Sequence, residues 1–313
     1  MKRRYVTVDV FTDRQFGGNQ LAVVMDAHGL SDAQMQQIAN EFNFSETTFV
    51  LPPRSQENTA HIRIFNRSQE MPFAGHPNVG TAYVLGSQES IFGRRPGQTM
   101  RFEEAAGIVT VEVTKEGGAP SGATIAAPQL LKVGRSVDAA GVAKCLGLNE
   151  ADVVLTHHEP ISVSVGIEFF VVEVAATALP RANPRRDAFA TVAQEHFGPS
   201  SFDRFSIFFY SRAGAGIEKL NARMFAPLSG TFEDPATGSA SAALGAYLAS
   251  LDTSADGEFE IEITQGVQMG RPSEIRVAAS KLKGQVIQVK VTGRCIRVME
   301  GILELIESPN SHA

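Results

Sequence analysis

The chain has 313 residues, with 28 basic and 34 acidic side chains and a formal net charge of −6. Hydrophobic residues make up 43% of it, which excludes an intrinsically disordered protein, because such chains are poorer in apolar side chains and carry more net charge. The mild negative charge argues against a nucleic-acid-binding protein, which presents a basic face. The length is typical of two domains, or of one large barrel.

Short β-branched or alternating runs recur along the chain with turn residues between them. Such a pattern is typical of antiparallel sheet. The runs are Tyr5–Phe11, Leu21–Met25, Thr47–Leu51, His61–Phe65, Ile108–Val113, Ile161–Val165, Phe169–Val174, Ser206–Tyr210, Ala222–Phe225, Ile261–Thr264, Val286–Val291 and Ile296–Met299.

Two amphipathic helices are predicted. The first follows Ser31, a residue type that caps helix N-termini, and the second spans Val137–Leu146. The apolar face of the first recurs at helical spacing and consists of Met35, Ile38, Ala39 and Phe42.

Two further helical segments, Asn78–Leu85 and Ala236–Leu248, are rich in Gly, Ala and Ser and have apolar residues on most sides. A helix without a polar face is normally buried, so we expect a sheet to surround each of them. Each follows a polar loop, Pro72–Pro77 in one case and Glu233–Ser239 in the other.

The strand before each loop carries the same signature. Ile62–Phe65 matches Ala222–Phe225, with Arg63 falling on Arg223, and Gly80 falls on Ala240 at the same offset. An offset of about half the chain predicts an internal duplication of strand, loop and central helix. Two such halves would place both loops at a shared cleft, where ligand sites tend to form.

The two loops end at helix N-termini, where unpaired N–H groups and the helix dipole attract an anion. We therefore expect a substrate carboxylate to bind Gly75 on one side and Gly238 and Ser239 on the other. The alternative is that Thr237–Ser239 only caps a buried helix.

Three side chains near these loops are suited to proton chemistry. Glu46 lies among phenylalanines, which disfavour its charged form and raise its pKa toward the range useful for proton transfer. His76 precedes a helix start, which favours a neutral imidazole. Asp234 precedes Pro235. The alternatives are a solvated glutamate at a helix end for Glu46, a structural histidine, and a helix cap for Asp234.

Six stretches, in order along nearly the whole chain, resemble the PhzF family of phenazine-biosynthesis isomerases and their relatives. They are Val8–Phe11, Gly18–Val23, Asn43–Phe49, Phe73–Pro77, Glu233–Ala240 and Gln265–Ser273.

The resemblance implies an α+β protein with the diaminopimelate-epimerase-like fold: two pseudo-symmetric domains, each a mostly antiparallel sheet wrapped around a central helix, with the active site between them. The glycine-rich segment Glu116–Ser121 is the best candidate boundary. We therefore expect a first domain over residues 1–118, completed by a C-terminal strand over 296–308, and a second domain over 119–295. Members of the family form homodimers and need no cofactor.

The resemblance also implies roles for the residues. In the phenazine enzyme a glutamate moves a proton between two carbons of a dihydro-hydroxyanthranilate ring, assisted by a histidine and an aspartate. In this chain these match Glu46, His76 and Asp234. The residues implied to lie near the substrate are Asn19, Ser45, Gly75, Gly238 and Ser239. The expected function is a cofactor-independent isomerase of a small carboxylated substrate.

Two other functions stay open, an epimerase or racemase of a small acid and a catalytically silent PhzF-like binding protein. The epimerases of this fold use two cysteines at the matched helix starts, which this chain lacks, and Cys145 is predicted on a surface helix. The segment Asn78–Thr81, and the absence of arginines from Ala213–Lys219, depart from the phenazine enzyme and argue against phenazine biosynthesis itself.

The remaining features predict a cytoplasmic protein without metal, membrane or nucleic-acid partners. The most apolar stretch, Phe169–Leu179, is broken by Glu173 and is shorter than the ~20 residues that cross a bilayer. Two isolated cysteines, Cys145 and Cys295, are too few for a disulfide framework or a zinc site.

Overall fold

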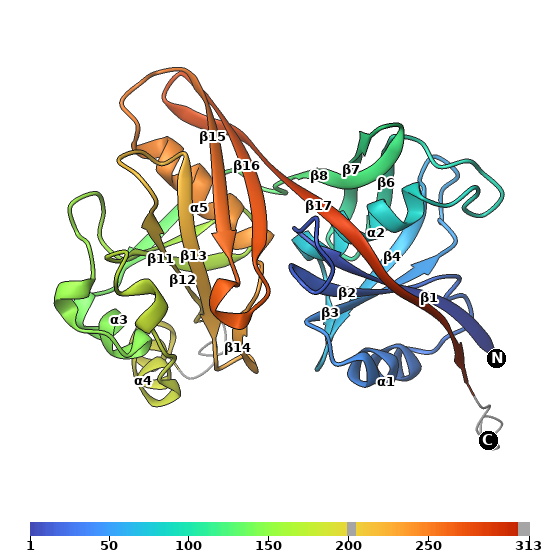
Figure 1. Cartoon of the computed structure of the whole chain (residues 1–313), viewed down its shortest axis with the longest axis horizontal. Helices are drawn as coiled ribbons and strands as arrows, with labels where there is room; N and C mark the ends of the chain where they lie inside the picture. The colour runs from blue at the N-terminus through green and yellow to red at the C-terminus, as the bar shows by residue number, and fades with distance from the viewer. Residues whose placement is uncertain (199–204, 306–313) are drawn as a thin grey trace. The chain divides into compact units, whose positions relative to one another are not determined.

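The computed structural model describes residues 1–198 and 205–305, and the chain packs as two compact units (Figure 1). Unit 1 comprises Met1–Phe16, Gln20–Ile125 and Arg294–Ala313, and unit 2 comprises Gly17–Asn19 and Ala126–Gly293. Both combine sheet with helix, which makes the protein an α+β structure.

Unit 1 is built from strands and two helices. The strands are β1 (Lys2–Val10), β2 (Asn19–Val24), β3 (Glu46–Leu51), β4 (Ala60–Asn66), β5 (Glu70–Met71), β6 (Thr99–Glu104), β7 (Gly107–Glu116), β8 (Ala119–Ala126) and the second part of β17 (Gln285–Glu304). The helices are α1 (Asp32–Phe42) and α2 (Gly75–Gly86).

Helix α2 is the central helix of unit 1 and contacts β1, β3 and β7. A β-carbon on Gly80 would lie 2.6 Å from Leu21 Cδ2 and 2.7 Å from Val10 Cγ2. Only a residue without a side chain allows the helix and the strands to approach this closely. The prediction of a buried, small-residue helix is confirmed, and the helix begins at Gly75, before Pro77, because proline is tolerated in a first helical turn.

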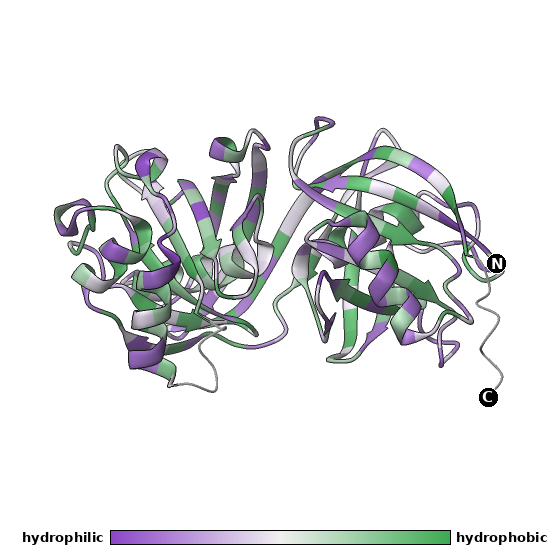
Figure 2. Cartoon of the chain, turned by 90° about the horizontal axis from the view of Figure 1, so that it is seen from below, coloured by the Kyte–Doolittle hydropathy of each residue, from purple (hydrophilic) through white to green (hydrophobic). Residues whose placement is uncertain are grey.

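Helix α1 covers the outer face of the same sheet. The predicted cap is present as a capping box, in which Ser31 Oγ accepts from Gln34 N at 3.2 Å and Gln34 Oε1 accepts from Ser31 N at 2.9 Å. The buried side chains of α1 pack against Phe49 and Phe65. The apolar periodicity of the sequence therefore marks the face that is buried (Figure 2 shows the hydropathy along the ribbon).

Unit 2 has the same kinds of element with a larger helical layer. Its strands are β9 (Lys132–Ser136), β10 (Ile161–Ser164), β11 (Glu168–Glu173), β12 (Ile207–Arg212), β13 (Lys219–Ala226), β14 (Thr231–Asp234), β15 (Gly257–Gln265), β16 (Ser273–Leu282) and the first part of β17. Its helices are α3 (Ala139–Leu146), α4 (Arg186–Phe197) and α5 (Gly238–Leu251), with the short 3-10 helices η1 (Glu150–Asp152), η2 (Leu179–Arg181) and η4 (Val267–Met269).

Helix α5 is central in unit 2 and contacts β10, β11, β15 and β16. A β-carbon on Gly245 would lie 2.6 Å from Val277 Cγ1. Helices α3 and α4 form the outer layer, and Cys145 of α3 is fully buried in it. Cys145 thus lies on an outer helix, as predicted, but on the face of that helix that packs against the core of unit 2.

The two units repeat one pattern of strand pairing. In unit 1, β2 and β3 pair in parallel, β3 and β4 antiparallel, and β4 and β6 in parallel. In unit 2, β11 and β12, β12 and β13, and β13 and β15 pair in the same three ways. Phe49 lies opposite Arg63 and Phe209 opposite Arg223, so the offset read from the sequence also holds in the register.

The parallel pairs were not predicted. A helix crosses between β2 and β3 and between β11 and β12, as a parallel pair requires, and helix α4 itself carries too little periodicity to have been recognised. The division by packing falls after Ile125 rather than after Gly118, because β8 continues to pair with β7 as far as Ile125. A C-terminal strand was predicted over 296–308. The observed strand β17 ends at Glu304, and residues 306–308 lie outside the described part.

Within residues 1–198 and 205–305, every helix is too short or too polar to span a membrane.

Candidate active site

Unit 1 brings Glu46 and His76 together. Glu46 is the first residue of β3, and His76 is the second residue of α2. Glu46 Oε2 lies 3.4 Å from His76 Nε2, with the glutamate side chain 20% exposed and the histidine 6% exposed. A partly exposed carboxylate next to a buried imidazole is an arrangement suited to proton transfer.

The His76 ring is neutral at physiological pH. Burial lowers its pKa to about 3, and a hydrogen bond with the backbone of Gln20 opposes this only in part. The prediction of a neutral imidazole is confirmed, although burial has the largest effect here. A neutral ring can hydrogen-bond Glu46 without holding it as a permanent ion pair.

A threonine pair links the two elements that carry these residues. Thr48 Oγ1 on β3 and Thr81 Oγ1 on α2 lie 2.9 Å apart, and both side chains are fully buried. Buried hydrogen bonds of this kind restrict sliding of a helix over a strand. The pair therefore connects the strand that carries Glu46 to the helix that carries His76.

Asp234 is held within unit 2 at the end of β14. Its Oδ1 accepts a hydrogen bond from Asn19 Nδ2 at 2.9 Å, and its Oδ2 accepts one from Thr237 Oγ1 at 2.6 Å. Helix α5 has Thr237 as its N-cap and no side-chain cap bond. The Asp234 side chain therefore bonds Asn19 and the N-cap residue Thr237, and its role as a catalytic group or as part of the helix cap stays a prediction.

Gln265, whose role the sequence did not reveal, holds the same loop. Its Nε2 donates to the Asp234 carbonyl at 2.7 Å, and its Oε1 accepts from Thr237 N at 2.9 Å. Next to it, Gly266 has φ +76°, and a β-carbon there would lie 2.5 Å from the Pro235 carbonyl oxygen. The Gln265–Ser273 stretch was noticed only through the family resemblance, because a contact between segments that are distant in the chain leaves no local pattern.

The predicted site residues thus fall into two sets. Unit 1 contains Ser45 directly before β3, Glu46, Gly75 as the first residue of α2, and His76. Unit 2 contains Asn19, Asp234, Gly238 and Ser239, the last two as the first residues of α5. Their joint action on one substrate stays a prediction.

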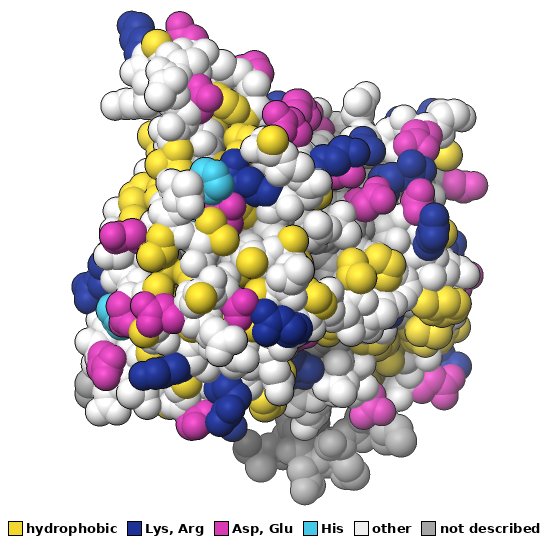
Figure 3. Space-filling model, turned by 60° about the vertical axis from the view of Figure 1, so that its left-hand side comes forward, with side chains coloured by type: hydrophobic (Ala, Val, Ile, Leu, Met, Phe, Trp, Pro, Cys, Tyr) yellow, Lys and Arg dark blue, Asp and Glu magenta, His cyan; other side chains and the backbone are white. Residues whose placement is uncertain are grey.

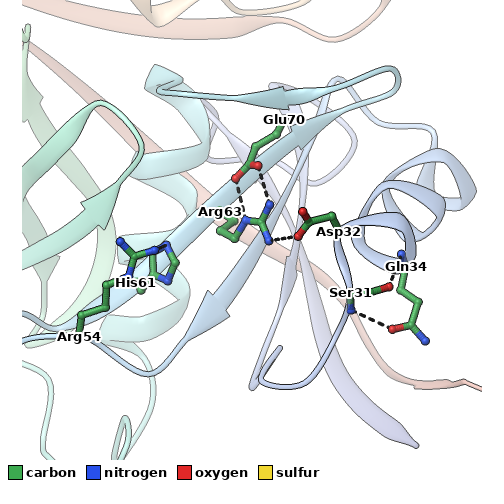
Figure 4. A network of polar contacts seen from close by, with 7 residues as sticks. All are labelled: Ser31, Asp32, Gln34, Arg54, His61, Arg63 and Glu70. Carbon is green, nitrogen blue, oxygen red and sulfur yellow. Dashed lines mark hydrogen bonds and ion pairs between the residues drawn. The ribbon is translucent and has the colours of Figure 1, made fainter. Parts of the chain in front are cut away.

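A different polar cluster in unit 1 is structural (Figure 4). Arg63 on β4 makes a two-pronged contact with Glu70, whose closest distance is 2.6 Å, and contacts Asp32 of α1 at 2.6 Å. Hydrogen bonding to Glu70 raises the pKa of Arg63 further. Burial lowers the pKa of His61, with the charge of nearby Arg54 as the second cause. These groups connect α1 to the sheet.

Other classes of site gain no support. Within the described ranges, no group of three or more His, Cys, Asp or Glu side chains is placed to hold a metal ion. Burial raises the pKa of Cys145 to about 12 and raises that of Cys295 as well, so neither is a reactive thiolate. On the face in Figure 3 acidic and basic side chains are intermixed, with no broad basic patch.

The sequence model of the PhzC-PhzF family, described as phenazine biosynthesis-like protein, matches residues 8–301. The chain belongs to this family. It is 35% identical over 305 residues to an uncharacterized isomerase of Mesorhizobium japonicum, covering 96% of this chain and 98% of the relative. It is 34% identical over 305 residues to a trans-2,3-dihydro-3-hydroxyanthranilate isomerase of Pseudomonas chlororaphis, covering 96% and 99%.

Solved structures share the fold. A PhzF-family protein of Bacillus anthracis superposes with a TM-score of 0.84 at 24% identity, covering 97% of this chain and all of that one. A structure named as a predicted epimerase of Pseudomonas aeruginosa gives a TM-score of 0.75 at 30% identity, with the same coverage. The chain is accordingly a PhzF-like isomerase, as the sequence predicted.

Proposed function

We propose that this protein is a cofactor-independent isomerase that moves a proton between two carbons of a small carboxylated substrate, with Glu46 as the acid/base. The observation that carries the proposal is the 3.4 Å contact between Glu46 Oε2 and the buried, neutral His76. The contact occurs in a chain that is 34% identical to a named isomerase of a hydroxyanthranilate ring.

The reaction is redox-neutral and balances with one carboxyl group. Glu46 removes a proton from a carbon next to an unsaturated system, and the electron pair of the broken C–H bond moves into that system. The protonated carboxyl then returns the proton to a second carbon at the far end of the conjugation. His76 orients the carboxyl by a hydrogen bond and stays neutral throughout.

Substrate binding would use both helix N-termini. The amides of Gly75 on α2 and of Gly238 and Ser239 on α5 suit a carboxylate, and they would also stabilise the negative charge that develops in the transition state. Asp234 would accept a hydrogen bond from an amino or hydroxyl group of the substrate. The orientation of Asp234 by Asn19, Thr237 and Gln265 supports this role.

The direct test is isotope exchange. The full chain is incubated with trans-2,3-dihydro-3-hydroxyanthranilate and with other small unsaturated acids in D₂O, and deuterium is located by NMR. For a substrate that is turned over, Glu46→Gln should lower kcat by roughly 10²–10⁴-fold, because the amide keeps the shape and loses the proton chemistry. Glu103→Gln is the control, since Glu103 is another glutamate of unit 1, but it is buried and accepts a hydrogen bond from Asn58 Nδ2. Full activity of Glu46→Gln would contradict the proposal.

An epimerase is the second candidate, because one structural relative is named as a predicted epimerase. Deuterium at a single inverted centre would support it, and deuterium at a new carbon would support isomerisation. The repeat favours isomerisation: at the offset that relates Arg63 to Arg223, the position of Glu46 is occupied in unit 2 by Ser206, which is not an acid/base. A silent binding protein would keep its biological role in Glu46→Gln.

The family resemblance further leads us to propose a homodimer that works without a cofactor. Light scattering of the purified chain, and activity after exhaustive dialysis against a chelator, test these two points.

A further inference from the structure

Glu104, the last residue of β6, is a buried carboxyl group that the proposed reaction does not use. Both of its oxygens are buried and have no hydrogen-bond partner within the described part of the chain. Alternation along the strand places it on the same face as Met100 and Phe102. This face is directed at α2, because Met100 Cε lies 3.6 Å from the position that a β-carbon on Gly86 would occupy.

Asn78, in the first turn of α2, is the polar side chain whose proximity affects the pKa of Glu104. Its Nδ2 donates to the carbonyl of Ala74, the N-cap of α2, at 3.0 Å. Its Oδ1 is buried and has no partner among the described residues. The two oxygens of Glu104 and Oδ1 of Asn78 are therefore three buried acceptors that lack a donor within the described ranges, and a buried polar atom without a partner is destabilising. A proton on Glu104 removes the conflict, because a neutral carboxyl can donate to Asn78 Oδ1.

Unit 2 contains the neutral counterpart of this group. Ala60 lies beside Phe102 and His61 beside Glu103 in the parallel register, so the next step places Ile62 beside Glu104. In unit 2 the residue that matches Ile62 in the repeat is Ala222, and it lies beside Gln265. Gln265 is the side chain that holds the start of α5 through Thr237 N. A protonated glutamate has the shape and the donor of a glutamine.

We propose that Glu104 is a positioning residue of this isomerase, which keeps its proton and donates it to Asn78 so that the first turn of α2, with Gly75 and His76, holds its place. The proposal rests on the proposed function in so far as His76 belongs to the active site. It adds a group that touches neither the substrate nor Glu46.

The electrostatic surroundings agree with a retained proton. Burial raises the pKa of Glu104 to about 8, and Asn78 only partly opposes this. On β7 the direct neighbour of Glu104 is Gly107, and the inward residues further along that strand are valines. The inward residues of β4 are Ala60, Ile62 and Ile64. The titratable side chains of α2 are His76, which is neutral, and Tyr83.

The charged residues of the neighbouring strands lie on the opposite face of the sheet from Glu104 or are exposed. Glu103 lies on the opposite face of β6 and is bonded by Asn58. His61 and Arg63 occupy the outward positions of β4, and Glu112 of β7 is exposed. Within the described elements packed around Glu104, no cationic side chain is therefore placed to stabilise its ionised form.

The test is a pH titration of the full-length protein by NMR, with ¹³C-labelled glutamate and ¹⁵N-labelled backbone, from pH 3.5 to pH 10. Glu104→Gln assigns the carboxyl signal and installs the unit 2 side chain, Glu104→Leu removes the donor, and Glu103→Gln is the control on the opposite face. We expect the Glu104 carboxyl to titrate near pH 8, and the amide signals of Gly75, His76 and Asn78 to move with the same midpoint.

In Glu104→Gln these amide signals should keep their low-pH positions throughout the range, and in Glu103→Gln they should behave as in the wild type. With any substrate that is turned over, kcat of the wild type should fall through the same midpoint while kcat of Glu104→Gln does not. A Glu104 carboxyl that titrates near its ordinary value of 4.5, or α2 amides that ignore its titration, would overturn the proposal. If Glu104→Leu fails to fold, the wild type and Glu104→Gln decide alone. The NMR result is independent of turnover, so failure of the proposed function would be seen separately.

Discussion

Units 1 and 2 share a pattern of strand pairing and use the same arginine position in different ways. Arg63 and Arg223 occupy equivalent places, each opposite a phenylalanine of the neighbouring strand. Arg63 is 18% exposed and contacts Glu70 and Asp32 near the surface. Arg223 is 6% exposed, pairs with Glu233, and donates to the carbonyls of Leu179 and Ala182.

The difference follows from the size of the helical layer. In unit 1 one helix, α1, covers Phe49 and Phe65. In unit 2, α3, α4 and the segment around η2 cover Phe209 and Phe225. The thicker layer buries the arginine and leaves backbone carbonyls for it to bond. An arginine at the same position of the repeat can thus make ion pairs near the surface or hydrogen bonds in the core, depending on which elements pack over it.

The two units also differ in which positions of the repeat carry ionisable side chains. Tyr210 of unit 2 donates to Glu173 Oε2 at 3.0 Å, and Arg212 donates to Glu173 Oε1 at 3.1 Å. The counterpart of Tyr210 in unit 1 is Val50, which is fully buried. Conversely, the position of Glu46 in unit 1 is occupied in unit 2 by Ser206. The pairing pattern is kept in both units, while the ionisable groups are specific to each.

The largest expected effect is the loss of Arg223. Arg223→Leu leaves Glu233 and two carbonyls without their donor, and should lower the free energy of unfolding by about 3–5 kcal/mol. Arg63→Leu should cost about 1–2 kcal/mol, because its partners remain near water. Urea unfolding, with hydrogen exchange to locate the weakened unit, measures both. Equal losses would show that the depth of the arginine does not matter.

A pH dependence specific to unit 1 comes next. The folded-state pKa of Glu104 is raised from 4.5 to about 8, so the unfolded chain loses this proton first. The free energy of unfolding should therefore fall as the pH rises from about 4.5 to about 8, by at most about 4 kcal/mol. The difference between wild type and Glu104→Gln in urea unfolding at several pH values isolates this group. A difference that is constant with pH would contradict the prediction.

The central helices should respond alike to added volume. Gly80→Ala and Gly245→Ala each place a β-carbon 2.6 Å from a neighbouring side chain, and should cost about 1–3 kcal/mol through overpacking. Gly214→Ala is the control, because its β-carbon would meet nothing within 4 Å. Thermal unfolding compares the three variants. A large loss at only one of the two helices would mean that the units differ in how closely their sheets approach the central helix.

The smallest expected effect concerns the polar network of unit 2. Tyr210→Phe removes the hydroxyl that contacts both Glu173 and His158 Nε2 and should cost about 1–2 kcal/mol, since Arg212 and His157 still bond the Glu173 carboxylate. Tyr247→Phe is a matched control, because Tyr247 packs edge-on against His158 in the same region through its ring. Equal losses in the two variants would indicate that the Tyr210 hydroxyl has no special contribution.

Local patterns of the sequence predicted a good part of this structure. The predicted strand runs lie on the observed strands, and Ser31 caps α1, since side-chain alternation and caps are properties of neighbouring residues. The repeat was visible because Arg63 and Arg223 stand in matching strands. Helix α4 was missed, and the parallel pairs were not foreseen, because strand direction depends on which distant segments meet.

The candidate site divides in the same way. The residue types at 46, 76 and 234, and the resemblance that assigns them proton chemistry, belong to the sequence. The roles of Gln265 and Glu104 do not, because each depends on a partner in another element of its unit: Thr237 for Gln265 and Asn78 for Glu104.

Residue order is enough to recognise the family and the internal repeat, since both are patterns along the chain. The packing of the folded chain sets which ionisable groups lose their contact with water. Burial lowers the pKa of His76 and raises the pKa values of Cys145 and Glu104. The pKa of a side chain depends on the dielectric and the hydrogen bonds around it, and segments that are distant in the chain supply most of both.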